Sequence, residues 1–177
     1  MPLPRTYLVA RIPPYTTDDF YAADVAATVL GTGKASRLYR SLVRERRLAK
    51  DVGTFAFPLR TGAAMLLVRA TGFADVDPDA LEAGLVEELE ALAETDPEEL
   101  DRGVAMNETQ IVRGIERVGQ RADLLSMFEL FFDDPGRLNT EVDRLRAVTV
   151  DRLRAFTEEY LGADNRVVVT YVPGGEA

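Results

Sequence analysis

The sequence contains no histidine and no cysteine among its 177 residues. Zinc, copper and non-haem iron sites are built mainly from imidazole and thiolate ligands, and serine or cysteine nucleophiles need an imidazole base. Most chemistry of these kinds is therefore excluded for this chain. Carboxylate, lysine, tyrosine, hydroxyl and arginine chemistry remains. Without cysteine there are no disulfides, so cysteine usage does not indicate a compartment.

Long apolar runs are also missing from the sequence. A membrane-spanning helix needs roughly 20 consecutive apolar residues, and no segment approaches that length. The first five residues, Met1 to Arg5, are not followed by the apolar stretch of a signal peptide. The length and the hydrophobic content of 46% predict a single globular domain over residues 1–177.

Positive charge is scarce relative to negative charge. Lys plus Arg is 21 and Asp plus Glu is 30, which gives a net charge of −9 and argues against nucleic acid or an anionic membrane as a partner. Residues 34–50 carry seven basic residues and one acid, and residues 77–101 carry eleven acids and no Lys or Arg. Two interpretations stay open: two solvated helix faces, or a basic patch that faces an acidic partner or a peptide carboxylate.

Residues with high β-propensity occur in four short runs. They predict strands at residues 6–12, 51–57, 63–70 and 166–172. Arg60-Thr61-Gly62 lies between the second and third runs and predicts an antiparallel hairpin.

Helical spacing of apolar residues dominates the rest of the chain. It predicts helices from about residue 18 to 30, from 36 to 47, after the N-cap residues Asp77, Asp96 and Thr149, from 121 to 132, and around residues 142–148. The apolar stripe of the helix after Asp96 extends to Val118. Strands and helices do not alternate as in βαβ units. The predicted fold is therefore α+β, with a mostly antiparallel sheet and helices packed on one face.

Three other patterns fail on closer reading. Residues 31–36 suggest a phosphate-binding loop, but that motif needs Gly at position 28 and Ser or Thr at position 35, where this chain has Thr28 and Ala35. The acids of residues 77–101 lack the internal glycine turn of a calcium loop. A carboxylate pair for glycoside hydrolysis is not excluded by composition, but no glutamate lies in an evidently apolar segment.

Residues 30–49 carry a more specific pattern. They resemble the form L-G-G-G-x-S-S-R-L-x-x-x-L-R-E-x-x-x-L-A-Y. The chain thereby resembles the second, C-terminal domain of the pitrilysin/insulinase-type zinc metallopeptidases, the inverzincins that include the mitochondrial processing peptidases. The resemblance extends from about Leu3 to Pro173. The matching residues of the segment are Gly31, Gly33, Ser36, Arg37, Leu38, Leu42, Arg44, Glu45, Leu48 and Ala49.

The resemblance implies a half-clamshell enzyme in which two homologous α+β domains enclose a chamber. The N-terminal domain of such enzymes binds zinc through H-x-x-E-H and a distal Glu. This chain cannot supply that site, so the zinc and the catalytic residues are expected in a partner N-terminal domain or subunit. The chain itself is expected to close the chamber and position a peptide substrate. Whether it is a fragment or a separate subunit stays open. The alternative is a structural or assembly domain with no role in catalysis.

The resemblance also implies candidate substrate-binding residues. In many members this domain contributes an Arg, and a Tyr seven residues later, near the scissile carbonyl. Arg44 matches the Arg, whereas the Tyr position falls on Asp51 or, with a one-residue gap, on Lys50. A lysine there could donate to a developing oxyanion, or it could be an ordinary surface residue. Gly31 and Gly33 either border the substrate cleft or only end a helix.

Overall fold

The computed structural model describes residues 3–172. Within them, four strands form one antiparallel sheet in the order β2-β3-β1-β4. The strands are β1 (Arg5–Ile12), β2 (Ala49–Phe57), β3 (Ala64–Gly72) and β4 (Arg166–Tyr171). The predicted hairpin is confirmed as the β2–β3 pair. The segment Pro173-Gly174-Gly175, which follows the last predicted strand in the sequence, lies outside the described residues.

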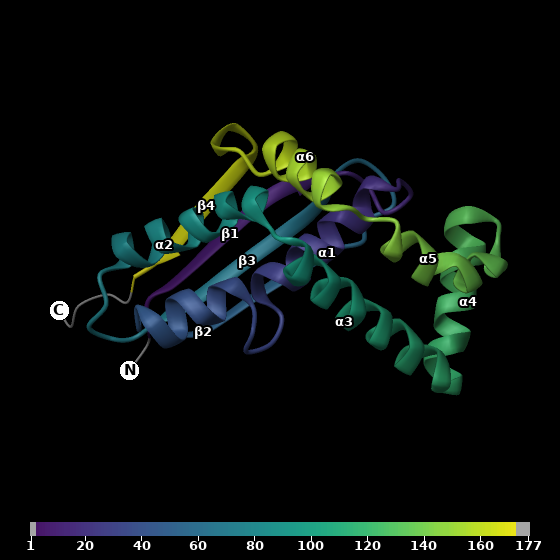
Figure 1. The fold of residues 1–177 in the computed structure, drawn as a ribbon, viewed down its shortest axis with the longest axis horizontal. Helices are drawn as coiled ribbons and strands as arrows, with labels where there is room; N and C mark the ends of the chain where they lie inside the picture. Colours follow the sequence, from purple (N-terminus) through teal and green to yellow (C-terminus); the bar gives the residue numbers. More distant parts are fainter. Residues whose placement is uncertain (1–2, 173–177) are drawn as a thin grey trace.

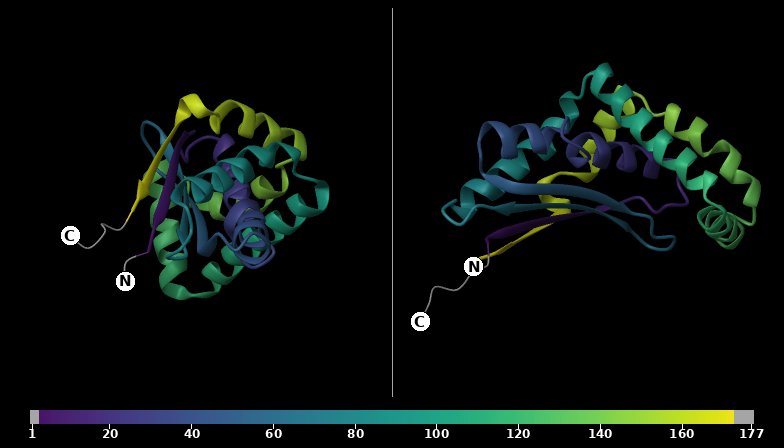
Figure 2. Two further views of the ribbon diagram at one scale, coloured as in Figure 1. Left: turned by 90° about the vertical axis from the view of Figure 1, so that its left-hand side faces the viewer. Right: turned by 90° about the horizontal axis from the view of Figure 1, so that it is seen from below.

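Helices cover one face of this sheet (Figures 1 and 2). The predicted α+β architecture is therefore confirmed. Helix α4 is set apart, beyond the hairpin end of the sheet, and Arg60 of the hairpin loop donates to the Leu130 carbonyl near its C-terminus at 2.9 Å. The α-helices are α1 (Asp19–Gly31), α2 (Pro78–Glu90), α3 (Pro97–Glu116), α4 (Val118–Phe132), α5 (Glu141–Arg146) and α6 (Val150–Tyr160). Shorter helical segments are η1 (Tyr39–Glu45), η2 (Ala91–Glu94), η3 (Pro135–Thr140) and η4 (Ala163–Asn165).

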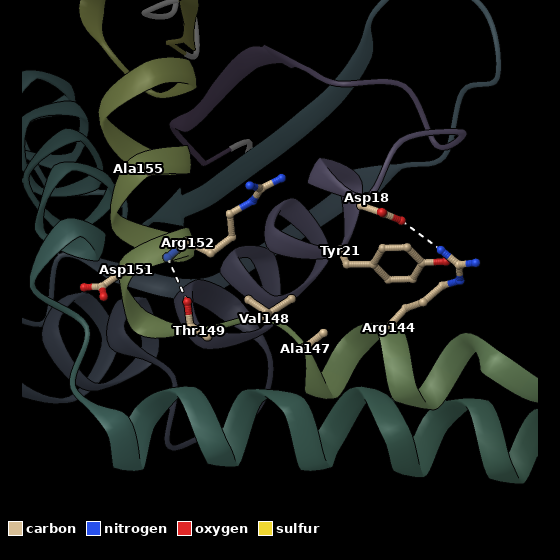
Figure 3. Close-up of a pocket in the computed structure, with 9 residues that line it drawn as sticks. All are labelled: Asp18, Tyr21, Arg144, Ala147, Val148, Thr149, Asp151, Arg152 and Ala155. Carbon is tan, nitrogen blue, oxygen red and sulfur yellow. Dashed lines mark hydrogen bonds and ion pairs between the residues drawn. The ribbon is translucent and has the colours of Figure 1, made fainter.

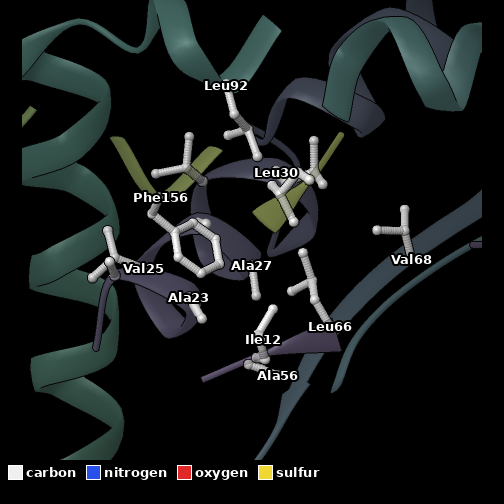
Figure 4. Packing of buried hydrophobic residues seen from close by; sticks show 14 of the residues in the cluster. Ile12, Ala23, Val25, Ala27, Leu30, Ala56, Leu66, Val68, Leu92 and Phe156 are labelled. Carbon is white, nitrogen blue, oxygen red and sulfur yellow. The ribbon is translucent and has the colours of Figure 1, made fainter. Parts of the chain in front are cut away.

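Helix α1 forms the centre of the hydrophobic core, between the sheet and the outer helices (Figure 4). Its alanines are small enough to let the neighbouring elements approach closely. Gly103 of α3 allows an even closer approach of α3 to α1, since a Cβ atom at this position would lie 2.8 Å from Val29 Cγ2. From the sheet side, alternate residues such as Leu8 and Leu66 enter the core and are fully buried. We call this side of the sheet the covered face.

The three predicted N-caps are confirmed. The side chains of Asp77, Asp96 and Thr149 accept hydrogen bonds from backbone N–H groups in the first turns of α2, α3 and α6. These contacts satisfy N–H groups that have no partner within the helix, which is why such residues mark helix starts in a sequence.

Two sequence expectations need correction. The helix expected at residues 36–47 is mostly the π-helix η1, in which the Arg46 N–H donates to the Ser41 carbonyl at 2.8 Å. The longer hydrogen-bond ladder changes the direction of the residues after Leu42, which is buried as expected. Val118 does not continue the buried stripe of α3. It begins α4 and is 73% exposed, because the chain turns at Arg117.

Candidate functional site

Among the described residues, no helix covers the second face of the sheet, which we call the open face (Figure 2). Its central row pairs Val9 with Leu67 and Val167, and Leu67 with Phe55. Phe55 is 51% exposed and Val167 is 65% exposed. Contiguous exposed apolar side chains of this kind are typical of an interaction surface.

Polar residues occupy the end of the open face where β2 begins. Arg5 Nε donates to Thr71 Oγ1 at 3.1 Å, and Arg5 Nη1 donates to the Tyr7 hydroxyl at 3.3 Å. On the neighbouring strands, Arg69 Nη1 donates to Asp51 Oδ1 at 2.9 Å. The open face thus has an apolar part and a polar end rich in arginine.

Of the predicted substrate-binding residues, Lys50 precedes Asp51 at this end of β2, and Arg44 belongs to η1, the helical segment before β2. Arg44 is exposed in the last turn of η1, and Lys50 is exposed in β2. Ala49 pairs with Gly72 and Asp51 pairs with Thr71, so Lys50 is the extra residue of a β-bulge. Bulges change the direction of side chains and often border functional sites. The contact of both residues with a substrate stays a prediction.

Gly31 and Gly33 lie elsewhere, on the covered side of β2. A Cβ atom at Gly31 would lie 2.5 Å from Thr54 Oγ1, so glycine permits the close approach of α1 to β2. Gly33 has a φ of 80°, a conformation that favours glycine. The structure does not bring these glycines to the open face, and their contact with a substrate stays a prediction.

The basic and acidic runs of the sequence partly pair with each other. Arg37 Nη2 lies 2.5 Å from Glu99 Oε2 in a buried ion pair, and Arg46 Nη1 lies 2.7 Å from Glu87 Oε2 at the surface. Arg40 Nη2 also lies 3.5 Å from Glu99 Oε1. Within residues 3–172, the other four basic residues of the run form no ion pair. These are Lys34, Arg44, Arg47 and Lys50.

A cleft of about 630 Å³ lies at the start of α1, between α5 and α6 (Figure 3). Its charged groups already have partners: Arg144 Nη1 donates to Asp18 Oδ1 at 2.8 Å, and Arg152 pairs with Asp19. The cleft lies in the helical layer, and none of Arg44, Lys50, Gly31 and Gly33 lines it.

Beneath the covered face, a buried polar cluster connects α1 to α5. The Tyr21 hydroxyl donates to Glu141 Oε1 at 2.7 Å, and Arg137 Nε donates to the same oxygen at 3.2 Å. Burial, and then the hydrogen bond to Glu141, raise the pKa of Tyr21. Nearby, burial and the Glu141 charge raise the pKa of Asp24 to about 6. These groups lie on the helix side of the molecule, and their contacts hold helices together.

Zinc does not fit the residues of this chain. The sequence offers no imidazole or thiolate, and residues 3–172 contain no group of three or more acidic side chains placed to hold a metal ion. In the same range no helix is both long enough and apolar enough to cross a bilayer.

Sequence reasoning did not identify the polar end of the open face as a unit. Arg5, Tyr7 and Arg69 come from strands distant in the sequence, and strand pairing brings them together. The alternation of buried and exposed residues within each strand was the available signal, because it assigns all of them to the same face once the register is known.

Three solved structures are similar to this chain over nearly all of its length. A protease from Helicobacter pylori is 24% identical with a TM-score of 0.88, and the match covers 98% of this chain and 42% of that chain. A protein from Bordetella pertussis assigned as a zinc protease is 25% identical with a TM-score of 0.85, covering 97% and 95%. The inactive peptidase domain of a protein from Bordetella parapertussis assigned as a zinc protease is 24% identical with a TM-score of 0.88, covering 100% and 94%.

A family model described as the peptidase M16 inactive domain matches residues 1–107, which is more than half of the chain. No curated protein matches the chain. The family match confirms the resemblance to the non-zinc-binding domain and does not favour the purely structural alternative. The chain belongs to the family of peptidase M16 inactive domains.

Proposed function

We propose that this chain is the non-catalytic half of a zinc-dependent endopeptidase, in which it closes the proteolytic chamber and positions the peptide substrate. The observation that carries the proposal is the open face, an apolar sheet surface with a basic end. In an isolated globular domain such a surface would be covered. As one wall of a chamber, it would contact the side chains of an extended peptide.

The zinc and the hydrolytic chemistry would come from a histidine-bearing partner domain or subunit. Arg44 and Lys50 would contribute by holding the peptide or by donating hydrogen bonds near the scissile carbonyl, where a positive charge stabilises a developing oxyanion. Both side chains are exposed, Arg44 in the helical segment before β2 and Lys50 in the bulge where β2 begins, which supports this role.

The test mixes this chain with its proposed histidine-bearing partner, as a separate protein or joined to it, and measures peptide hydrolysis. We expect activity only from the mixture or the joined protein. The isolated chain should neither cleave peptides nor retain stoichiometric zinc against a chelator. One equivalent of retained zinc, or full activity of the partner alone, would contradict the proposal.

In the assembled enzyme, Arg44→Ala should lower kcat/KM about tenfold, which corresponds to about 1.4 kcal/mol of lost transition-state stabilisation. Arg121→Ala is the matched control, because Arg121 is an exposed arginine on α4, away from the open face. A loss of transition-state stabilisation below about 0.5 kcal/mol, within the range of ordinary surface substitutions, would mean that Arg44 has no role in binding the substrate.

A further inference from the structure

The charges of the open face differ from those of the whole chain. The chain has a net charge of −9, but the outward positions of the four strands carry three arginines and one acid. These are Arg5, Arg11, Arg69 and Asp51. Lys50 adds a further positive charge in the bulge. The acidic excess lies instead on α2 and the start of α3, in the helical layer.

Arg5 is held in place by neutral groups. Its Nε and Nη1 atoms donate to the Thr71 and Tyr7 hydroxyls, and no carboxylate among residues 3–172 lies within ion-pair distance of it. A guanidinium has five N–H donors, so Arg5 is oriented while several donors stay free for an anion. Tyr171, opposite Arg5 on β4, is 56% exposed and provides an aromatic side chain beside it.

Arg69 lies next to Arg5, since its cross-strand partner on β1 is Tyr7, two residues along from Arg5. Diagonal neighbours in an antiparallel sheet have side chains about 7–8 Å apart, so one carboxylate can reach both guanidinium groups. On the other side of Arg69 lies Gly53. A Cβ atom there would be 3.4 Å from Arg69 Nε, so the guanidinium packs directly along β2. Asp51 already binds Arg69 as an acidic ligand would.

We propose that Arg5, Tyr7 and Arg69, which together with Asp51 are here called the arginine cluster, bind an acidic side chain of an extended peptide, which would replace Asp51 as the partner of Arg69. The adjoining row of Val9, Leu67 and Phe55 would then contact an apolar side chain on the same face of that peptide. This inference rests on the proposed function and names its substrate class: peptides with an acidic residue two or four positions from an apolar one, because side chains on one face of a strand repeat every second residue.

The arginine cluster can be tested by binding of fluorescein-labelled peptides of about ten residues to the 177-residue chain. One peptide carries Glu with Val residues at alternate positions, and the second carries Gln in place of Glu. We expect the Glu peptide to bind about three- to tenfold more tightly, a modest factor because the arginines are partly exposed to solvent. The preference should decrease as the salt concentration rises.

Variants of the cluster make the test specific. Arg5→Ala and Arg69→Ala should each reduce the preference for the Glu peptide to less than twofold. Asp51→Asn should strengthen binding of the Glu peptide, because it frees Arg69 from its internal partner. The matched control is Arg11→Ala. Arg11 lies on the same strand and the same face, six residues and roughly 20 Å from Arg5, and hydrogen-bonds to Asn165.

Three outcomes would overturn the inference. Equal binding of the Glu and Gln peptides would remove the acidic preference while leaving the proposed function in place. An equal loss in Arg11→Ala and Arg69→Ala would show attraction by net charge and not by this cluster. If neither peptide binds the chain, the inference fails, whereas the proposed function is decided separately by peptide hydrolysis in the mixture with the partner. Circular dichroism establishes that each variant is folded.

Discussion

The covered and open faces of the sheet carry similar side chains in different surroundings. Leu66 and Leu67 are neighbours on β3, yet Leu66 is fully buried under the helices and Leu67 is only half-buried on the open face. Ion pairs differ in the same way, since Arg37–Glu99 is buried in the helical layer and Arg69–Asp51 is exposed to solvent. The comparison teaches that one face of the sheet is used for folding, whereas the other is available to a partner.

The largest expected difference concerns the two ion pairs. Glu99→Ala leaves the Arg37 guanidinium buried with only the Ala91 carbonyl as a partner, and should lower the free energy of unfolding by about 3–5 kcal/mol. Asp51→Ala should lower it by about 1 kcal/mol or less, because exposed pairs contribute little. Urea unfolding measures both. Similar losses in the two variants would contradict the distinction between the faces.

Leu66 and Leu67 on β3 test the difference between the covered and open faces with uncharged side chains. Leu66→Ala should cost about 2–5 kcal/mol, because it removes a side chain from a close-packed core and leaves a cavity. Leu67→Ala should cost about 1 kcal/mol or less in the isolated chain, as for a surface substitution. Thermal or chemical unfolding of the two variants, made in the same strand, provides the comparison. A loss of unfolding free energy in Leu67→Ala as large as that in Leu66→Ala would mean that the open face contributes to folding.

A smaller effect is expected from Asp24, beneath the covered face. Its pKa of about 6 lies above the ordinary value of 3.8, so the folded state binds the proton more tightly than the unfolded state. The resulting stabilisation is present at acid pH and is lost as the pH rises from about 4 to about 6. Asp24→Asn should therefore raise the unfolding free energy at pH 7.5 by about 1–3 kcal/mol and have little effect near pH 4. An unchanged or lower stability of this variant at pH 7.5 would contradict the prediction.

Much of the fold could be predicted from local signals. Runs of β-branched and aromatic residues located the strands, and the caps Asp77, Asp96 and Thr149 located helix starts, because each signal depends on residues within one turn or one strand. The π-helical form of η1 was missed, since Leu38 and Leu42 are compatible with an α-helix as well. Val118 was misplaced because an apolar residue at helical spacing does not reveal where a long helix ends.

The candidate site was predictable only in part. Family resemblance selected Arg44 and Lys50, and the structure shows both exposed, in η1 and at the start of β2. The arginine cluster could not be found in the same way, because Arg5 and Arg69 lie 64 positions apart in the numbering of the sequence and meet through strand register. The pairing of Arg37 with Glu99 is likewise a long-range contact, and local charge patterns could not distinguish it from two separate solvated faces.

The sequence by itself determined that this chain holds no imidazole or thiolate metal site, and that its elements form an antiparallel sheet with helices on one face. Composition and short-range periodicity are sufficient for both conclusions. Only the tertiary structure decided which side of each strand remains uncovered and which charged groups meet there. Those outcomes depend on strand order and register, which arise from the packing of segments far apart along the chain.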